Sequence, residues 1–156
     1  MHAPSALKLP KTPTRLPEDP KLYAARSRDF FDQVASDPSD WRDLQEHVAD
    51  IFHKCRFKVE VEKTIESARG KVEVDVYAEE TIQGRRHIIM CECKHWKANI
   101  SQTVVHAFRT VVADTAANVG FIITTSNYQP GAIAASVLTN IRLRDWRGFQ
   151  KDSVFP

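Results

Sequence analysis

The chain has 156 residues, of which 42% are hydrophobic and 27% are charged, and its formal net charge is +2. This length suits one globular domain with its own core and is short for two. The weak net charge does not by itself indicate nucleic-acid binding, so that interpretation depends on where the charges lie. Three cysteines, an odd number, argue against a disulfide framework and favour a reducing, cytoplasmic setting. The sequence contains no apolar run of about 18 residues, so no membrane-spanning helix is expected.

The N-terminal part of the chain differs in composition from the rest. Five of the eight prolines fall within residues 1–20, and proline removes backbone donors and blocks helix formation. We expect an irregular arm there, followed by a helix from Pro20 to about Ala35. The sequence therefore predicts an N-terminal arm and helix over residues 1–38 and a single domain over residues 39–156.

The first half of this domain reads as one helix and three strands. A cap at Ser39 or Asp40 predicts a helix to about Cys55. Alternating residues predict strands over 57–62, 72–78 and 87–94, with short turns between them, which is typical of an antiparallel meander. Five apolar residues at helical spacing predict the buried face of the helix: Trp41, Leu44, Val48, Ile51 and Phe52.

In the second half, helices and strands alternate. Residues 101–118 and 129–138 have helical periodicity, and residues 141–143 suggest a short last strand. Residues 119–125 form an apolar run that predicts a strand covered on both faces. Trp146 and Phe149 are expected to close the core. The predicted fold is α/β (α+β), with an αβββαβ core and a mixed central sheet flanked by helices.

Charged residues lie within two of the predicted strands. Glu92 and Lys94 share one strand face by alternation, and Asp75 joins them if the two strands are neighbours. Two carboxylates can bind a hard cation such as Mg²⁺, and a lysine can position the attacking water or stabilise negative charge. The carboxylates favour the charged form of Lys94, so we expect an electrostatic role and not a general base. This pattern predicts a metal-dependent phosphodiester hydrolase.

Three sequence segments together resemble a known group of nucleases. They are residues 70–76 (GKVEVDV), residues 92–94 (ECK), and residues 120–126 (GFIITTS) followed by Gly131-Ala132. In the αβββαβ order they resemble the PD-(D/E)xK nuclease superfamily, which has the restriction-endonuclease-like fold, and within it the Mrr-like restriction endonucleases. The resemblance covers residues 40 to 149.

The resemblance implies a role for each motif residue. Asp75 and Glu92 match the acidic ligands of Mg²⁺, for which Mn²⁺ is a possible substitute. The backbone carbonyl of Cys93 is expected to approach the same ion. Lys94 matches the lysine that orients the nucleophilic water or offsets charge in the transition state.

Two positions are less clear-cut. A glutamate on the preceding helix often completes such sites; Glu46 is the candidate, although Gln45 fits that place about as well by spacing. The motif's proline is replaced by Val74, at a position that varies within the superfamily.

Cysteine and histidine also alternate near the motif, as Cys91, Cys93 and His95. Thiolates and imidazole suit zinc, but the spacing lacks the usual C-x2-C knuckle, so buried small side chains are the preferred interpretation. Trp96 can pack against the core or stack on a nucleotide, and core packing is favoured.

Four polar residues are candidates for nucleic-acid contacts. Gln102 and His106 lie one helical turn apart, just past the motif strand. Arg69 and Lys71 flank a strand end, where they can contact phosphates. The alternative for all four is an ordinary solvated surface.

The resemblance implies a Mg²⁺-dependent endonuclease that hydrolyses DNA. The alternatives are a nuclease-fold module that binds nucleic acid or a partner without cleavage, and an RNA nuclease or junction resolvase. Asp75, Glu92 and Lys94 occurring together favours catalysis. Since sequence specificity normally needs an additional recognition element, we expect a homodimer or a partner protein that supplies targeting.

Overall fold

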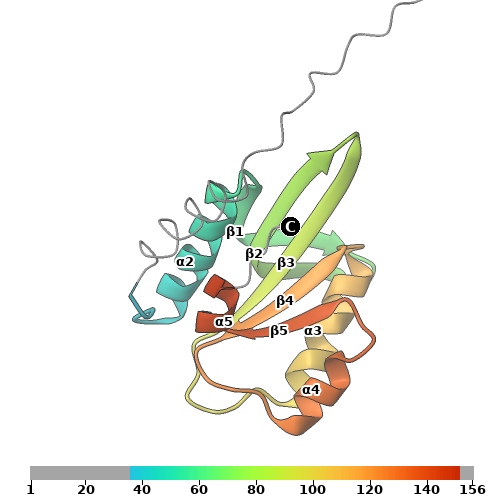
Figure 1. Cartoon of the computed structure of the whole chain (residues 1–156). Helices are drawn as coiled ribbons and strands as arrows, with labels where there is room; N and C mark the ends of the chain where they lie inside the picture. The colour runs from blue at the N-terminus through green and yellow to red at the C-terminus, as the bar shows by residue number, and fades with distance from the viewer. Residues whose placement is uncertain (1–35, 152–156) are drawn as a thin grey trace, which may run out of the picture. The chain divides into compact units, whose positions relative to one another are not determined.

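The computed structural model describes residues 36–151. The arm and the helix predicted within residues 1–35 lie outside the described residues and stay predictions. Figure 1 shows the elements of the described part, which are α2 (Trp41–Lys54), β1 (Lys58–Ser67), β2 (Gly70–Ile82), β3 (Arg85–Lys94), α3 (Gln102–Asp114), β4 (Val119–Thr124), α4 (Pro130–Ser136), β5 (Ile141–Asp145) and α5 (Trp146–Lys151). The αβββαβ order is confirmed.

The strands form one mixed sheet of five strands in the order β1-β2-β3-β4-β5. The pairs β1–β2 and β2–β3 are antiparallel, which confirms the predicted meander. The pairs β3–β4 and β4–β5 are parallel, and the crossovers α3 and α4 connect them. Helices α2 and α5 cover one face of the sheet, and α3 and α4 cover the other (Figure 1).

Helix α2 begins at the predicted cap. The Asp40 carboxylate accepts a hydrogen bond from the backbone N–H of Asp43 at 2.8 Å, which satisfies a donor that the first helical turn leaves free. Its apolar stripe is buried as expected at four of the five predicted positions: Leu44, Val48, Ile51 and Phe52.

The prediction that Trp41 is buried is wrong. Its side chain is 48% exposed. Trp41 is the first residue of α2, so it lies at the edge of the helix–sheet contact, and its indole instead lies 5.0 Å from the guanidinium carbon of Arg42. A cation–π contact of this kind suits a solvated aromatic ring.

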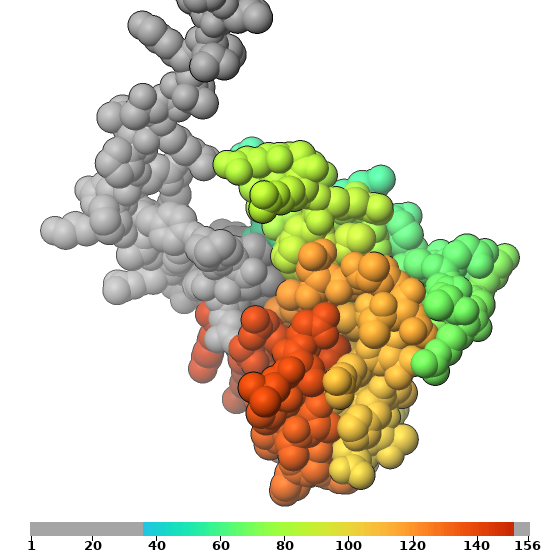
Figure 2. Space-filling view, turned by 90° about the vertical axis from the view of Figure 1, so that its right-hand side faces the viewer, coloured from blue at the N-terminus to red at the C-terminus, as the bar shows by residue number. Residues whose placement is uncertain are grey.

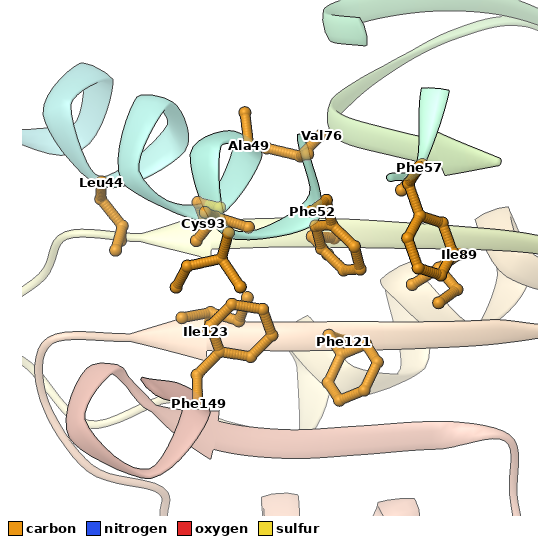
Figure 3. Close-up of a cluster of buried hydrophobic side chains, with 14 of the residues drawn as sticks. Leu44, Ala49, Phe52, Phe57, Val76, Ile89, Cys93, Phe121, Ile123 and Phe149 are labelled. Carbon is orange, nitrogen blue, oxygen red and sulfur yellow. The ribbon is translucent and has the colours of Figure 1, made fainter. Parts of the chain in front are cut away.

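Aromatic rings connect α2 to the C-terminal end of the described chain (Figure 3). The ring centroids of Phe52 and Phe149 lie 5.9 Å apart, and those of Phe121 and Phe149 lie 5.7 Å apart. Phe149 therefore bridges helix α2 and strand β4. Trp146 is also buried, so the prediction that these two residues close the core is confirmed, although they lie on a helix, α5, that the sequence did not predict.

Helix α3 packs against the opposite face of β4 through Val105, Phe108 and Val112. This contact requires a glycine on the strand. A Cβ atom at Gly120 would lie 2.6 Å from Val112 Cγ2, 2.8 Å from Phe108 Cε1 and 2.9 Å from Ile141 Cδ1. Strand β4 has core on both faces, as its apolar sequence predicted.

The boundaries of several elements differ from the predicted ones. Strands β1 and β2 form a longer hairpin than expected, because their outer parts pair in register up to Ser67 and Gly70. Helix α3 ends at Asp114, shortly before Ala116 adopts a positive φ of 55°. Within residues 36–151, no helix is long and apolar enough to cross a membrane.

We predict that Gly120→Ala destabilises the protein by about 1–3 kcal/mol, because the added methyl group overpacks the contact between α3 and β4. Urea denaturation measures this change. Adding Val112→Ala removes the nearest clashing atom, so the double variant should lose less stability than the sum of the two single variants. Wild-type stability in Gly120→Ala, or strict additivity with Val112→Ala, would contradict the tight contact.

Candidate active site

Strands β2 and β3 separate at Asp75. Their pairing runs from the hairpin turn to Val76 and Cys91. One residue further, the Asp75 Oδ2 atom accepts the backbone N–H of Cys93 at 2.7 Å. A side chain thus replaces the backbone acceptor that a continued ladder would supply. On the other side of Asp75, the neighbouring residue of β1 is Glu62, whose φ is 52°.

At the same point, the side chains of β2 change the side of the sheet on which they are buried. Val76 and Ala78 pack in the core on the α2 side, whereas Val74 packs in the core on the α3 side. Residues two apart on a regular strand share a face, so β2 twists sharply around Asp75. The twist directs the outer part of the β1–β2 hairpin toward α3. It also places Asp75 just beyond the end of the regular ladder between β2 and β3.

Strand β3 supplies the other two charged residues. Cys91 and Cys93 point into the buried core on the α2 side, which confirms that they are buried small side chains. Glu92 and Lys94 alternate with them on the opposite face. The Lys94 Nζ atom lies 2.5 Å from Glu92 Oε1, and these side chains are 22% and 24% exposed.

Trp96 lies beside this ion pair. The prediction that it packs in the core is wrong, because its side chain is 44% exposed. The Lys94 Nζ atom is 4.9 Å from the centroid of the indole ring. The ammonium group therefore lies near both a carboxylate and an aromatic ring, and much of that ring is exposed to solvent.

The surroundings of the Asp75 carboxyl disfavour its charged form. Burial raises the pKa of Asp75 to about 6, and the negative charge of Glu92 adds to the shift. The hydrogen bond from the Cys93 N–H and the positive charge of Lys94 lower that pKa in part. Two partly buried carboxylates that repel each other are stabilised by a cation between them.

The donor atoms at this place suit a hard cation. The N–H and C=O of one strand residue point to the same side, so the Cys93 carbonyl faces β2, as its N–H does. With Asp75 and Glu92 it forms an all-oxygen donor set, which fits Mg²⁺ because that ion keeps several waters and needs one or two carboxylates. Among the described residues, no group of three or more histidine, cysteine or acidic side chains is arranged to hold a metal.

The zinc alternative does not fit this geometry. Cys91 and Cys93 are buried, and burial raises the pKa of both thiols, which disfavours the thiolate that zinc needs. The Nε2 atom of His95 lies 3.1 Å from the carbonyl oxygen of Pro38, at the start of α2. The histidine is therefore a structural contact between the motif strand and the segment before the first helix.

The prediction that Glu46 completes the site from the preceding helix needs a correction. Glu46 is exposed on α2, and the charged groups that act on Asp75 are Glu92, Lys94 and Glu73. Gln45, in contrast, is only 3% exposed, and its Oε1 atom is buried without a hydrogen-bond partner in the described part of the chain. Of the two candidates, Gln45 is the one whose side chain is directed into the protein. Spacing alone could not separate two adjacent helical residues.

The four predicted nucleic-acid contacts lie at three different places, and only two of them lie together. Arg69 and His106 line the same groove beside α3. Lys71 lies apart from that groove, with its Nζ atom 3.6 Å from Glu66 on the neighbouring strand. Gln102 is exposed at the start of α3, next to α4.

The hydroxyl groups of two residues outside the predicted site fasten neighbouring strands to one another. The buried Thr124 donates from Oγ1 to the backbone carbonyl of Lys94 at 3.0 Å. The Tyr128 hydroxyl lies 2.6 Å from the carbonyl oxygen of Ile122 and 2.9 Å from that of Arg144, and so ties β4 to β5. A threonine at the end of an apolar strand was the only available signal for the first contact.

One solved structure has a similar fold, and two others align with this chain less closely. AF1548, described as a protein of unknown function, aligns with a TM-score of 0.57 and 17% identity over 69% of this chain and 59% of its own. The DNA modification-dependent restriction endonuclease AspBHI aligns with a TM-score of 0.49 and 12% identity, over 95% of this chain and 38% of its own. MspJI restriction endonuclease, in complex with a 27-mer oligonucleotide, aligns with a TM-score of 0.49 and 10% identity, over 86% and 31%.

The chain thus spans less than two thirds of the length of each of these structures. No curated protein matches it. The family model that describes the Mrr-type restriction endonuclease catalytic domain matches residues 37–151. This match runs from the segment before α2 to the end of α5, and it includes Asp75, Glu92 and Lys94. The chain therefore belongs to the Mrr-like restriction endonucleases of the PD-(D/E)xK superfamily, and its described part corresponds to the domain that the family model describes.

Proposed function

We propose that this domain is a Mg²⁺-dependent endonuclease that hydrolyses DNA phosphodiester bonds at Asp75, Glu92 and Lys94. The observation that supports this most directly is the convergence of two carboxylates and a lysine at the point where β2 and β3 separate. Membership of a restriction endonuclease family supports DNA as the substrate.

Each residue has a distinct proposed role. Asp75, Glu92 and the Cys93 carbonyl hold the cation. When bound, Mg²⁺ lowers the pKa of a coordinated water and polarises a phosphoryl oxygen. Lys94 donates hydrogen bonds to the attacking water or to the phosphate, and its charge stabilises the developing negative charge. The Asp75 carboxyl must be ionised to bind the cation, so protons compete with the metal below about pH 6.

A binding module without cleavage remains the alternative. Its weakness is energetic, because the Asp75 carboxylate is held where burial and a second carboxylate disfavour its charge. A carboxylate whose charged form is disfavoured in this way is typical of catalytic sites, and a surface that only binds does not need one. Targeting is proposed to come from a second copy of the chain or from a partner protein.

Cleavage of a DNA duplex in the presence of MgCl₂ tests the activity. Asp75→Ala and Lys94→Ala should each lower the rate by about 100-fold or more, because each removes a charge that acts on the transition state. Lys97→Ala is the matched control, since Lys97 is an exposed lysine three residues further along. Unchanged cleavage in Lys94→Ala would refute the site, and cleavage of RNA but not of DNA would identify an RNA nuclease.

Asp75 should also affect stability in a pH-dependent way. Its pKa is about 6 in the folded protein against an ordinary value of 3.8, so its contribution to stability is fully present below about pH 4 and is lost as the pH rises through 6. Without metal at about pH 8, Asp75→Asn should therefore be more stable than the wild type by on the order of 1 kcal/mol, allowing for solvent screening.

Denaturation at acidic and alkaline pH, with and without MgCl₂, measures this effect. The advantage of Asp75→Asn should shrink at about pH 4.5, and MgCl₂ should raise the Tm of the wild type but not of the variant. Glu46→Gln serves as the control, because Glu46 is an exposed carboxylate on α2. An Asp75→Asn protein that is less stable than the wild type at both pH values would contradict the repulsion between Asp75 and Glu92.

Trp96 is predicted to position Lys94. Trp96→Leu removes the aromatic face beside the ammonium group and should lower the single-turnover cleavage rate by about 2- to 5-fold, the equivalent of an exposed cation–π contact. Trp96→Phe retains an aromatic face and should restore most of the rate. Equal rates for the leucine and phenylalanine variants would show that the ring does not act through Lys94.

A further inference from the structure

A groove lies between the tip of the β1–β2 hairpin and the far end of α3. The hairpin reaches across to the helix, and the Arg69 Nε atom lies 3.0 Å from Asp114 Oδ2. Figure 2 shows this hairpin, in green, beside α3, in yellow to orange. The groove has a volume of about 260 Å³ and is lined by Arg69, His106, Arg109, Thr110, Ala113 and Asp114.

The helix contributes one continuous face to this groove. His106, Arg109 and Ala113 are spaced by three and four residues, so they lie one above the other on α3. The residues that α3 buries against the sheet, such as Val105 and Val112, lie on the adjoining side of the helix. Ala113, whose side chain is small, also lines the groove.

The hairpin tip is held in a defined conformation. Ser67 Oγ donates to the Gly70 carbonyl at 2.7 Å and accepts the backbone N–H of Arg69 at 3.2 Å. Further down the hairpin, Ile65 and Val72 pack against the core that α3 covers. Arg69 is therefore presented to α3 by an anchored turn, which lowers the entropic cost of using it to bind a ligand.

The charges in the groove favour an anion. His106 and Arg109 are exposed, and within residues 36–151 neither side chain forms an ion pair. Arg69 is paired with Asp114, yet its side chain is 73% exposed and keeps donors free for a second partner. Two guanidinium groups and an imidazole thus face one carboxylate. Arginine forks bind phosphate oxygens in a bidentate manner.

The groove is distinct from the candidate active site. None of its lining residues is among the charged groups that act on Asp75. Arg109 lies seven residues after the start of α3, which is about 10 Å along the helix axis. The two places nevertheless belong to one side of the molecule, because α3 covers the sheet face that carries Glu92 and Lys94 and because the hairpin starts from Asp75.

We infer that this groove binds a backbone phosphate of the DNA substrate at a distance from the bond that is cleaved. The inference rests on the proposed function and extends it to a second contact, with Arg69 and Arg109 as the phosphate ligands and His106 as an additional donor. Such a contact carries no sequence information, but it fixes how the duplex lies over the active site.

Binding of a fluorescent DNA duplex at several NaCl concentrations, with CaCl₂ in place of MgCl₂ to prevent cleavage, tests the groove. His106→Gln/Arg109→Gln should weaken binding by about 5- to 10-fold and reduce the slope of log K against log salt by about 1, as expected for one lost phosphate contact. Arg85→Gln is the matched control, because Arg85 is an exposed arginine at the opposite end of β3. The control should keep wild-type affinity and slope.

Asp114→Asn provides an opposite test. It removes the one carboxylate of the groove and releases Arg69, so the affinity for DNA should rise by about 2-fold or more, which a merely structural role would not produce. Wild-type affinity and salt slope in His106→Gln/Arg109→Gln would refute phosphate binding in the groove. The proposal that Asp75, Glu92 and Lys94 cleave DNA would still stand. A wild-type protein that neither binds nor cleaves DNA would overturn the proposed function itself.

Discussion

The hydrogen bond from the Cys93 N–H to the Asp75 carboxylate is the contact on which the rest of the site depends. It ends the ladder between β2 and β3 without leaving a buried donor unpaired, so the two strands can separate at little cost. Separation gives Asp75 an accessible oxygen while alternation directs Glu92 and Lys94 to the same region. The burial that raises the pKa of Asp75 follows from the same arrangement.

The parallel half of the sheet supplies the rigidity that this opening needs. Thr124 Oγ1 and the backbone N–H of Thr125 both donate to the Lys94 carbonyl, at 3.0 Å and 3.2 Å. Strand β3 is thus hydrogen-bonded to β4 at Lys94, beyond the point where its ladder with β2 has ended. Strand β4 is in turn buried between α3 and the phenylalanine cluster around Phe149. A lysine on a strand held in this way has little freedom in its backbone.

The sequence predicted the element order, the meander and the shared face of Glu92 and Lys94, because alternation and apolar periodicity are local properties. It failed where the outcome depends on packing between distant segments. Trp41 and Trp96 are apolar, but Trp41 is the first residue of α2 and Trp96 lies in the loop after β3, so both stay exposed. Glu46 and Gln45 are adjacent, and only the orientation of α2 on the sheet decides which one is buried. The groove between Arg69 and Arg109 requires the twist of β2, which no sequence pattern indicated.

The twist at Asp75 divides the described domain into two mechanical parts, a rigid parallel core and a hairpin arm that leans over α3. Asp75 belongs to the arm strand, and Glu92 belongs to the core. A cation that both carboxylates bind would therefore fasten the arm to the core. If the proposed function is correct, metal binding and DNA binding through Arg69 each increase the affinity for the other, because both restrict the motion of the same hairpin.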